Sequence, residues 1–275
     1  FSNLCSWRFL YDTQFAVIDD FLVFKFWAGE QLAYMMPVGN GDLKAVLRKL
    51  IEDADQEKHN FCMLGVCSNM RADLEAILPE RFIFTEDRAY ADYIYLRSDL
   101  ATLKGKKFQA KRNHINRFRN TYPDYEYTPI TPDRIQECLD LEAEWCKVNN
   151  CDQQEGTGNE RRALIYALHN FEALGLTGGI LHVNGKIVAF TFGMPINHET
   201  FGVHVEKADT SIDGAYAMIN YEFANRIPEQ YIYINREEDL GIEGLRKAKL
   251  SYQPVTILEK YMACLKDHPM DMVRW

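Results

Sequence analysis

The chain has 275 residues and a mass of 32.0 kDa, enough for one large domain or two of ordinary size. Hydrophobic residues make up 47% of it and aromatic residues 13%, which excludes a wholly disordered protein. The net charge of -9 argues against general coating of nucleic acid, because that affinity comes from neutralised phosphates, but it does not exclude a local basic site.

No apolar run approaches the roughly twenty residues that a membrane span needs, and no secretory signal peptide is visible. The cysteines are odd in number and contain no Cys-x-x-Cys pair. We therefore expect a cytoplasmic protein with reduced thiols rather than a disulfide scaffold or a zinc site. The seven cysteines are Cys5, Cys62, Cys67, Cys138, Cys146, Cys151 and Cys264.

The first hundred residues predict strands that alternate with helices, which is typical of an α/β layer structure. Apolar residues at helical spacing predict a helix over 43–58, with Asp42 as its N-cap. The turn at 37–42 could seat a phosphate, but it also fits an ordinary strand-to-helix turn, and the acidic Asp42 favours the second interpretation. The other predicted elements are a helix at 69–78 and strands at 21–27, 32–36, 61–66, 81–85 and 93–96.

The most basic segment follows, between Leu100 and Pro123, where no acidic residue occurs. We expect a helix over 98–122 that joins two domains. A cationic helix in an acidic chain could dock a phosphate-rich partner, or it could pair with acidic surfaces of the flanking domains. The candidate nucleic-acid contacts are Lys104, Lys106, Lys107, Lys111 and Arg112.

After Pro123 a second alternation begins, with an Asn184-Gly185 hairpin as its clearest signal. The polar stretch 149–159 predicts a mobile loop that could close over a site. The order β-α-α-β-β-β-α-β-α-β matches an acetyltransferase-like (GNAT) fold. We therefore predict an N-terminal GNAT-like domain at 1–97 and a C-terminal one at 123–275 that carries the site, with mixed sheets flanked by helices. The predicted elements are strands at 125–130, 178–183, 186–194, 200–205, 231–234 and 255–261, and helices from 131, at 160–174 and at 213–225.

The stretch 235–252 is the most charged part of this half, with four residues of each sign directly after a predicted buried strand. Charged groups at a strand end can converge on a crevice and shift one another's pKa values. A solvated loop with ion pairs is the alternative.

The same stretch carries a resemblance. Gly244-Leu245, Lys249 and Tyr252-Gln253-Pro254 resemble the closing segment of phosphatidylglycerol lysyltransferase C-terminal domains and of the related Fem-type peptidoglycan aminoacyltransferases. Ala248 departs from the Phe of that pattern. The resemblance implies tandem GNAT-like domains, transfer of an acyl or aminoacyl group, and transfer RNA as the partner of the basic helix. It does not fix the substrate.

In GNAT folds the fourth and fifth strands diverge, and the donor carbonyl lies in the gap. Glu206 could accept a proton from the attacking amine, or it could pair with Lys207 or with a later arginine. His204 is more consistent with a packed strand residue. The catalytic candidates are Glu206, Asp239, Arg246, Lys249 and Tyr252. The donor-binding candidates are Lys207, Gly214, Ala215, Tyr216, Asn235, Arg236 and Glu237.

The loop at 208–214 bears on the identity of the donor. Acetyltransferases cradle the coenzyme A pyrophosphate there with an Arg/Gln-x-x-Gly-x-Gly/Ala element, of which only Gly214-Ala215 is present. The added Asp213 favours an aminoacyl-tRNA donor over acetyl- or acyl-coenzyme A. The acceptor would be an amine or hydroxyl of a small molecule, peptide or lipid. The alternatives are an acetyl-coenzyme A-dependent N-acetyltransferase and a degenerate, non-enzymatic domain that binds tRNA or a peptide. No metal site is predicted.

Overall fold

The computed structural model describes residues 2–149 and 155–266, which form two compact units. The larger unit combines Phe1–Ser6 with Asp92–Ile257, and the smaller unit combines Trp7–Ala91 with the chain from Leu258 onward. Part of the expected loop at 149–159, residues 150–154, lies outside the described residues. Helix α8 (Glu155–His169) begins within the second half of that stretch.

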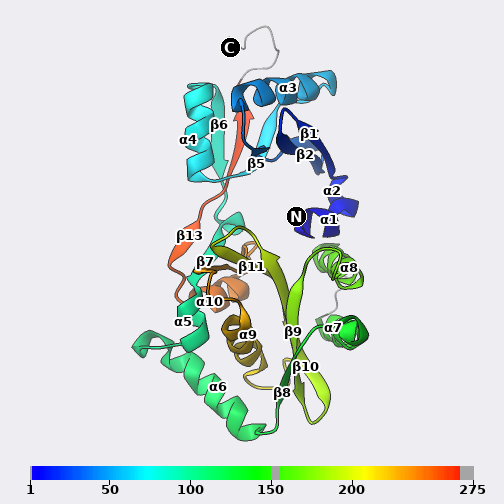
Figure 1. Ribbon diagram of the computed structural model, residues 1–275, viewed down its shortest axis with the longest axis vertical. Coiled ribbons are helices and arrows are strands. Elements are labelled where there is room, and N and C mark those ends of the chain that lie inside the picture. Colours follow the sequence, from blue (N-terminus) through cyan, green and yellow to red (C-terminus); the bar gives the residue numbers. More distant parts are fainter. Residues whose placement is uncertain (1, 150–154, 267–275) are drawn as a thin grey trace. The chain divides into compact units, whose positions relative to one another are not determined.

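The smaller unit is a mixed sheet with two longer helices, α3 (Leu43–Gln56) and α4 (Ser68–Ile77) (Figure 1). Its strand order is β1-β2-β3-β5-β14-β6, with β4 paired to β2. The expected N-cap of α3 is confirmed, because the Ala45 amide donates to Asp42 Oδ1 at 3.1 Å. The remaining elements are β1 (Gln14–Ile18), β2 (Phe21–Ala28), β3 (Gln31–Tyr34), β4 (Val38–Gly39), β5 (Cys62–Val66), β6 (Phe82–Glu86), β14 (Tyr261–Leu265), α2 (Arg8–Tyr11) and a 3₁₀ turn at Arg88–Tyr90.

A disulfide joins Cys62 of β5 to Cys264 of β14, which are partners in the antiparallel register. The expectation that all cysteines are reduced thiols is therefore wrong for this pair. The two residues are 202 positions apart, so the spacing of cysteines along the chain carried no sign of it. Cys5, Cys138 and Cys146 are free thiols.

The larger unit is built on a seven-stranded sheet in the order β13-β7-β12-β11-β10-β9-β8. The predicted hairpin is confirmed: Asn184 and Gly185, both with positive φ, connect β9 to β10. The strands are β7 (Asp92–Leu96), β8 (Glu126–Pro129), β9 (Thr177–Val183), β10 (Lys186–Pro195), β11 (Thr200–Ala208), β12 (Tyr233–Asn235) and β13 (Thr256–Leu258).

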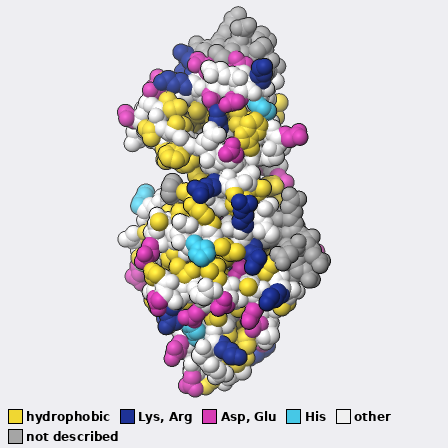
Figure 2. All heavy atoms as spheres, turned by 90° about the vertical axis from the view of Figure 1, so that its right-hand side faces the viewer, with side chains coloured by type: hydrophobic (Ala, Val, Ile, Leu, Met, Phe, Trp, Pro, Cys, Tyr) yellow, Lys and Arg dark blue, Asp and Glu magenta, His cyan; other side chains and the backbone are white. Residues whose placement is uncertain are grey.

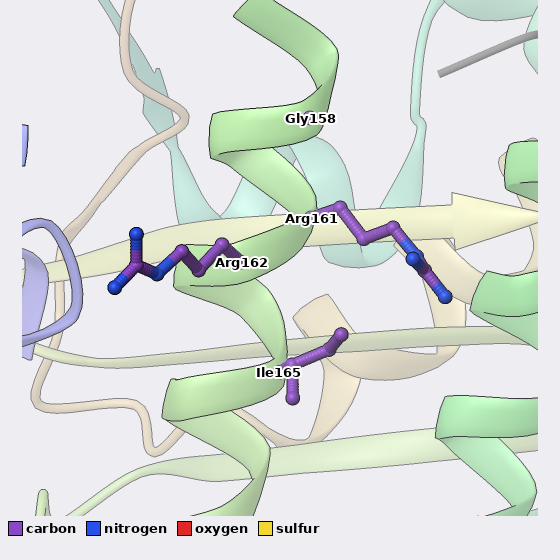
Figure 3. Close-up of a pocket in the computed structure, with 4 residues that line it drawn as sticks. All are labelled: Gly158, Arg161, Arg162 and Ile165. Atoms are coloured by element: carbon purple, nitrogen blue, oxygen red, sulfur yellow. The ribbon is translucent and has the colours of Figure 1, made fainter. Parts of the chain in front are cut away.

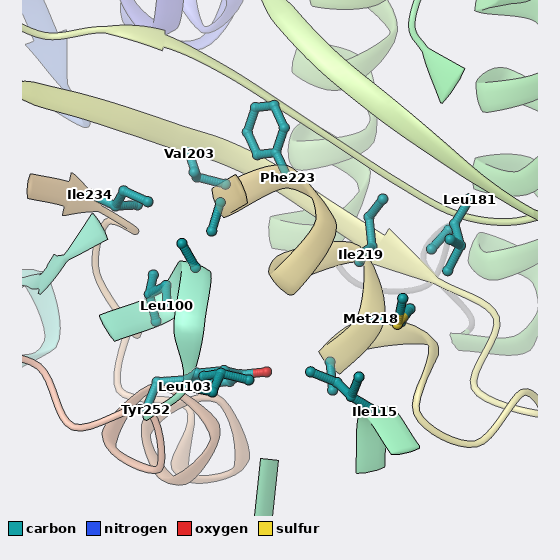
Figure 4. Close-up of a cluster of buried hydrophobic side chains, with 14 of the residues drawn as sticks. Leu100, Leu103, Ile115, Leu181, Val203, Met218, Ile219, Phe223, Ile234 and Tyr252 are labelled. Atoms are coloured by element: carbon teal, nitrogen blue, oxygen red, sulfur yellow. The ribbon is translucent and has the colours of Figure 1, made fainter. Parts of the chain in front are cut away.

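Helices cover both faces of this sheet, because neighbouring strand residues enter different cores. Ile180 and Phe190 pack with α7 and α8, whereas Leu181 and Ala189 pack with α5, α6 and α9 (Figures 1 and 4). The helices are α1 (Ser2–Ser6), α5 (Arg97–Thr102), α6 (Gln109–Thr121), α7 (Ile135–Asn149), α8, α9 (Ala215–Arg226) and α10 (Glu243–Leu250), with 3₁₀ turns at Lys106–Phe108 and Pro132–Arg134. Across the described chain, the helices are all too short or too polar to span a membrane.

This division differs from the expected domain ranges in three respects. The boundary lies between Ala91 and Asp92 rather than at residue 97, and β7 joins the sheet of the larger unit beside β12. The expected linking helix at 98–122 is instead α5 and α6, both packed against α9. The last predicted strand, 255–261, is two strands, β13 in one sheet and β14 in the other. Local periodicity predicts that a segment is a strand, but it does not predict which sheet that strand joins.

Candidate active site

Strands β11 and β12 run parallel and then diverge. Their pairing covers three residue pairs, from Thr200 opposite Tyr233 to Gly202 opposite Asn235. Strand β12 ends there, whereas β11 continues to Ala208. Beyond Gly202, the edge of β11 that faced β12 has no strand partner among the described residues. The predicted gap between the fourth and fifth strands of this half is therefore present.

A bulge in β11 sets which side chains face the gap. The register against β10 passes from Val203 to Val205 and leaves His204 without a partner residue. A bulge of this kind reverses the alternation of side chains. Val203 accordingly belongs to the core beneath α9, whereas Val205 packs against the core beneath α7 and α8. Glu206 turns to the α9 side, where it accepts a hydrogen bond from Asn220 at 3.2 Å.

Glu206 forms an ion pair with Arg236, the residue that follows β12. Arg236 Nη2 lies 2.9 Å from Glu206 Oε1, and the two side chains are only 11% and 13% exposed. Burial lowers the pKa of Arg236, but Glu206, Tyr95 and Tyr252 together raise it by more, so that pKa lies above its usual value. Of the two partners that the sequence left open for Glu206, the later arginine is the one observed.

Two aromatic rings and one lysine complete this cluster. The Arg236 guanidinium lies 5.0 Å from the ring centre of Tyr252 and 5.7 Å from that of Tyr95. Lys111 Nζ lies 3.9 Å from the ring centre of Tyr252. Burial, and then the positive charge of Arg236, lowers the pKa of Lys111 to about 8, against an opposing effect of Glu206. Lys111, expected at a nucleic-acid surface, thus belongs to the cluster around Glu206.

Lys249 fixes the loop that carries Arg236. Its buried ammonium donates to the backbone carbonyls of Arg236, Glu237 and Glu238, which accounts for all three of its N–H groups. Burial, followed by the charge of Arg236, lowers the pKa of Lys249 to about 8. The Tyr95 hydroxyl donates to the Lys249 carbonyl at 2.8 Å. Lys249 therefore holds the loop of residues 236–238 in position.

The pair of Asp239 and Arg246 also holds that loop in place, in addition to Lys249. Arg246 Nε and Nη2 donate to the two oxygens of Asp239 at 2.7 and 2.9 Å, and the Asp239 side chain is 0% exposed. The Tyr93 hydroxyl and the Gly241 amide also donate to Asp239. The Arg246 hydrogen bonds hold the pKa of Asp239 far below its usual range.

Glu237 and Asn235 form hydrogen bonds with residues of the larger unit outside the Glu206 cluster. Glu237 Oε1 lies 2.7 Å from His204 Nδ1 and accepts from Asn3 of α1 at 2.7 Å. His204 Nε2 lies 3.0 Å from the Ser2 hydroxyl. Asn235 accepts from the Glu237 amide at 2.7 Å and donates to the carboxylate of Asp92. The contribution of α1 to this region had no signal in the sequence.

Two further donor-binding candidates, Lys207 and Tyr216, contact Trp145 of α7. Lys207 points to the opposite face of the sheet, where its Nζ lies 2.8 Å from Glu160 of α8 and 3.6 Å from the ring centre of Trp145. The side chain of Tyr216 is hydrogen-bonded to Trp145, and burial raises the Tyr216 pKa. The structure therefore does not bring Lys207 together with Glu206, although the two are adjacent in sequence.

The N-terminus of α9 is closely covered by α6. Gly214, with φ of 84°, precedes the helix, and a Cβ added to it would lie 2.9 Å from the His114 carbonyl oxygen. Asp213 is paired with Arg117 of α6 at 2.6 Å. Ala215 is buried beneath this contact. Any phosphate held by these amides would meet a carboxylate and a packed helix.

The basic segment is only partly available to a partner. Lys107 pairs with Asp99 at 2.8 Å, and Arg112 donates to the carbonyls of Leu103 and Gly105, which fixes the turn before α6. Lys104 and Lys106 are exposed. Part of the segment is therefore paired or bound within the larger unit, as one of the two interpretations expected, whereas docking of a phosphate-rich partner on the exposed lysines stays a prediction.

A shallow pocket of about 170 Å³ lies on α8, lined by Gly158, Arg161, Arg162 and Ile165. Figure 3 shows Arg161 and Arg162 pointing to opposite sides of the helix. Figure 2 shows several Lys and Arg side chains set among hydrophobic ones on the face that carries α7 and α8, with acidic side chains more numerous toward the bottom of the view. No residue of the Glu206 cluster lines this pocket.

Comparison with known proteins agrees with this architecture. L-PGS from Bacillus licheniformis superimposes with a TM-score of 0.67 and 19% identity, over 98% of this chain and 88% of that one. The C-terminal domain of a candidate lysylphosphatidylglycerol synthetase from Agrobacterium fabrum gives 0.70 and 12%, over 96% and 86%. An uncharacterised Mycoplasmoides gallisepticum protein is 25% identical over 177 residues, 62% of this chain.

The chain spans about half the length, 55%, of that Mycoplasmoides relative. The two solved structures show the fold, a tandem GNAT-like arrangement of mixed sheets flanked by helices. The family described as phosphatidylglycerol lysyltransferase, C-terminal, matches residues 1–264. The chain therefore belongs to that phosphatidylglycerol lysyltransferase C-terminal family, a family of acyl and aminoacyl transferases.

Proposed function

We propose that the protein transfers an aminoacyl group from aminoacyl-tRNA to an amine or hydroxyl acceptor, at the gap between β11 and β12. The observation that carries this proposal is the buried Glu206–Arg236 pair, which bridges the point where the two strands part. A cation fixed there, beside a strand edge that pairs with no other strand of the described chain, suits a donor carbonyl that becomes negatively charged when attacked. The acceptor attacks the ester directly, without a covalent enzyme intermediate.

The choice of donor rests on the N-terminus of α9. In the proposed reaction this helix end binds no pyrophosphate, because Asp213 and the packed α6 occupy its approach. An aminoacyl-tRNA donor needs no pyrophosphate cradle there. The exposed Lys104 and Lys106 are the candidates for contacts with its phosphates.

Other candidates have supporting roles in this proposal. Arg236 binds the donor carbonyl, and the ring of Tyr252, whose centre lies 5.0 Å from the Arg236 guanidinium, packs beside it. Lys249 and the Asp239–Arg246 pair keep Arg236 in place. Lys207, on the other face of the sheet, would act from the side of α7 and α8.

The acceptor follows from the family only as a class. Relatives named for lysylphosphatidylglycerol imply a lipid hydroxyl, and a soluble amine is the second class to test. Because aminoacyl-tRNA is made in the cytoplasm, we place the reaction there.

The test is a transfer assay on the purified chain with radiolabelled aminoacyl-tRNA, prepared from all twenty amino acids. Acceptors are vesicles containing phosphatidylglycerol and, separately, a set of small amines and peptides. Acetyl-coenzyme A replaces the tRNA in a parallel series. Label in lipid or amine that disappears with Glu206→Gln supports the proposal.

Transfer from acetyl-coenzyme A alone would replace the proposal with ordinary acetylation. Retained tRNA affinity without transfer to any acceptor would indicate a non-enzymatic binding domain. Exposed Glu243, which pairs with Lys247 on the surface of α10, supplies the matched control Glu243→Gln.

A further inference from the structure

The basic segment contains one lysine that is turned inward. Lys111 lies three residues after Phe108 and four before Ile115, both of which are buried in the core of the larger unit. Residues at these spacings share one helix face. Lys111 therefore extends from the apolar face of α6, toward the Tyr252 ring. Lys104 and Lys106, by contrast, are exposed.

Two charged groups and one aromatic ring face Lys111, each from a different part of the larger unit. Arg236, after β12, opposes a positive charge on its amine, and Glu206 of β11 favours one. Tyr252, after α10, presents its ring face. Within the described residues, Lys111 forms no ion pair shorter than 4 Å, because Glu206 is already paired with Arg236.

The neighbours of Lys111 on its own segment point elsewhere. Lys107 is paired with Asp99, and Arg112 binds backbone carbonyls. On the side of α9, Asp213 forms an ion pair with Arg117. Lys111 is thus half-buried beside the cationic Arg236 and has no ion-pair partner of its own within the described residues, a setting in which a lysine amine can lose its proton near neutral pH.

We propose that Lys111 is the general base of the transfer reaction, a role that rests on the proposed function of the same site. Its neutral amine takes the proton from the attacking amine or hydroxyl as the new bond to the carbonyl carbon forms. When the ester C–O bond breaks, the Lys111 ammonium returns that proton to the leaving oxygen. Proton and electron pairs balance without another reactant.

Glu206 is less suited to this role. Its carboxylate is held by Arg236 at 2.9 Å and by Asn220 at 3.2 Å, so taking up a proton would break a buried ion pair. In this account Glu206 is a positioning residue, which holds Arg236 toward the gap.

The first test requires no substrate. Protein labelled with ¹³C at the lysine ε-carbons is titrated by NMR from pH 6 to 11, and Lys111 is assigned by the signal lost in Lys111→Arg. The signal of Lys111 is expected to titrate near pH 8, below the value of about 10.4 for a lysine in a model peptide. Arg236→Gln should move the Lys111 titration upward. A Lys111 signal that titrates at the model-peptide value would overturn the assignment.

The second test separates a base from an RNA contact. Lys111→Arg keeps the positive charge but cannot act as a base at neutral pH. We expect kcat to fall by about 100-fold or more with little change in KM for the tRNA, and the limb of the pH–rate profile near 8 to disappear. Lys247→Arg, on the exposed surface of α10, is the matched control. A fully active Lys111→Arg in an active wild-type background would refute this inference, whereas a wild type inactive with every donor would refute the proposed function itself.

Discussion

The carboxylate of Glu206 and the guanidinium of Arg236 meet at 2.9 Å across the gap where β11 and β12 part. The bulge at His204 turns Glu206 toward this gap, and Lys249 holds the loop that presents Arg236. Three features of the larger unit therefore bring the pair together: the divergence of the two strands, the bulge at His204 and the hydrogen bonds of Lys249.

Removing one partner of this pair should be costly. Arg236→Met leaves the Glu206 carboxylate buried without its counter-ion, and we expect the free energy of unfolding to fall by about 3 kcal/mol. Urea denaturation followed by tryptophan fluorescence measures it. Lys247→Met, which breaks the exposed pair with Glu243, should change stability by less than about 0.5 kcal/mol. Equal effects of the two substitutions would contradict the burial of the Glu206–Arg236 pair.

Gly214 should not tolerate a side chain. Gly214→Ala combines a φ of 84° with a Cβ only 2.9 Å from the His114 carbonyl oxygen, so we expect a loss of about 1–3 kcal/mol. Gly244→Ala is the matched control, because nothing lies within 4 Å of its Cβ and it sits in helix α10. That substitution should be neutral or stabilising by about 0.5–1 kcal/mol. If Gly214→Ala were equally neutral, α6 would not cover the start of α9 as described.

The disulfide between β5 and β14 should stabilise the smaller unit. Reduction with dithiothreitol is expected to lower its stability by about 2–5 kcal/mol, and Cys62→Ala should make the protein insensitive to the reductant. Mass spectrometry of a non-reduced digest should identify the linked pair. Cys138→Ala is the control for a buried free thiol. Recovery of both Cys62 and Cys264 as free thiols from protein kept oxidised would contradict the bond.

Affinity for tRNA should depend on Lys104 and Lys106 more than on the rest of the basic segment. Replacing both by Gln should weaken binding and reduce the slope of log K against log salt by about 2. Lys111→Arg should leave binding unchanged, because that side chain faces the core. Fluorescence anisotropy at two salt concentrations measures both. An unchanged slope in the double variant would remove these lysines from the interface.

The pH dependence of stability should carry the signature of Lys111. Its pKa is lowered to about 8 in the folded protein, so between pH 8 and about 10.4 the unfolded chain binds more protons than the folded one. Wild-type stability relative to Lys111→Met should therefore rise with pH across this window. A stability difference that stays constant or falls with pH across this window would contradict the lowered pKa of Lys111. Urea midpoints at pH 7.5, 8.5 and 9.5 decide between these outcomes.

Periodicity and turn residues were sufficient to predict most elements of the larger unit, including the Asn184-Gly185 hairpin. The gap beside Glu206 was expected only from the likeness of the element order to GNAT folds. They could not predict that β7 and β14 join the sheets of the other halves of the sequence, because a strand's own residues do not specify its neighbours. The bulge at His204 was likewise invisible, and with it the separation of Lys207 from Glu206.

Two side chains of the cluster around Glu206 have a signal in the sequence. Asn220 is a polar residue among the buried apolar residues of α9, and Lys111 lies on the same face of α6 as Phe108 and Ile115. A polar residue at an apolar position of a helix is the pattern that would have found both. The contacts of Ser2 with His204 could not be foreseen, because they join residues 202 positions apart.

The most direct test of the central claim is where the donor's aminoacyl end binds. A stable amide analogue of 3′-aminoacyl-adenosine, titrated into isotope-labelled protein, would be followed by NMR. We expect the largest amide shifts at 203–207 and 235–237, on the two sides of the gap, and their loss in Arg236→Gln. Shifts confined to the α8 pocket around Arg161 and Arg162, or a titration without shifts, would contradict the placement of the transfer site between β11 and β12.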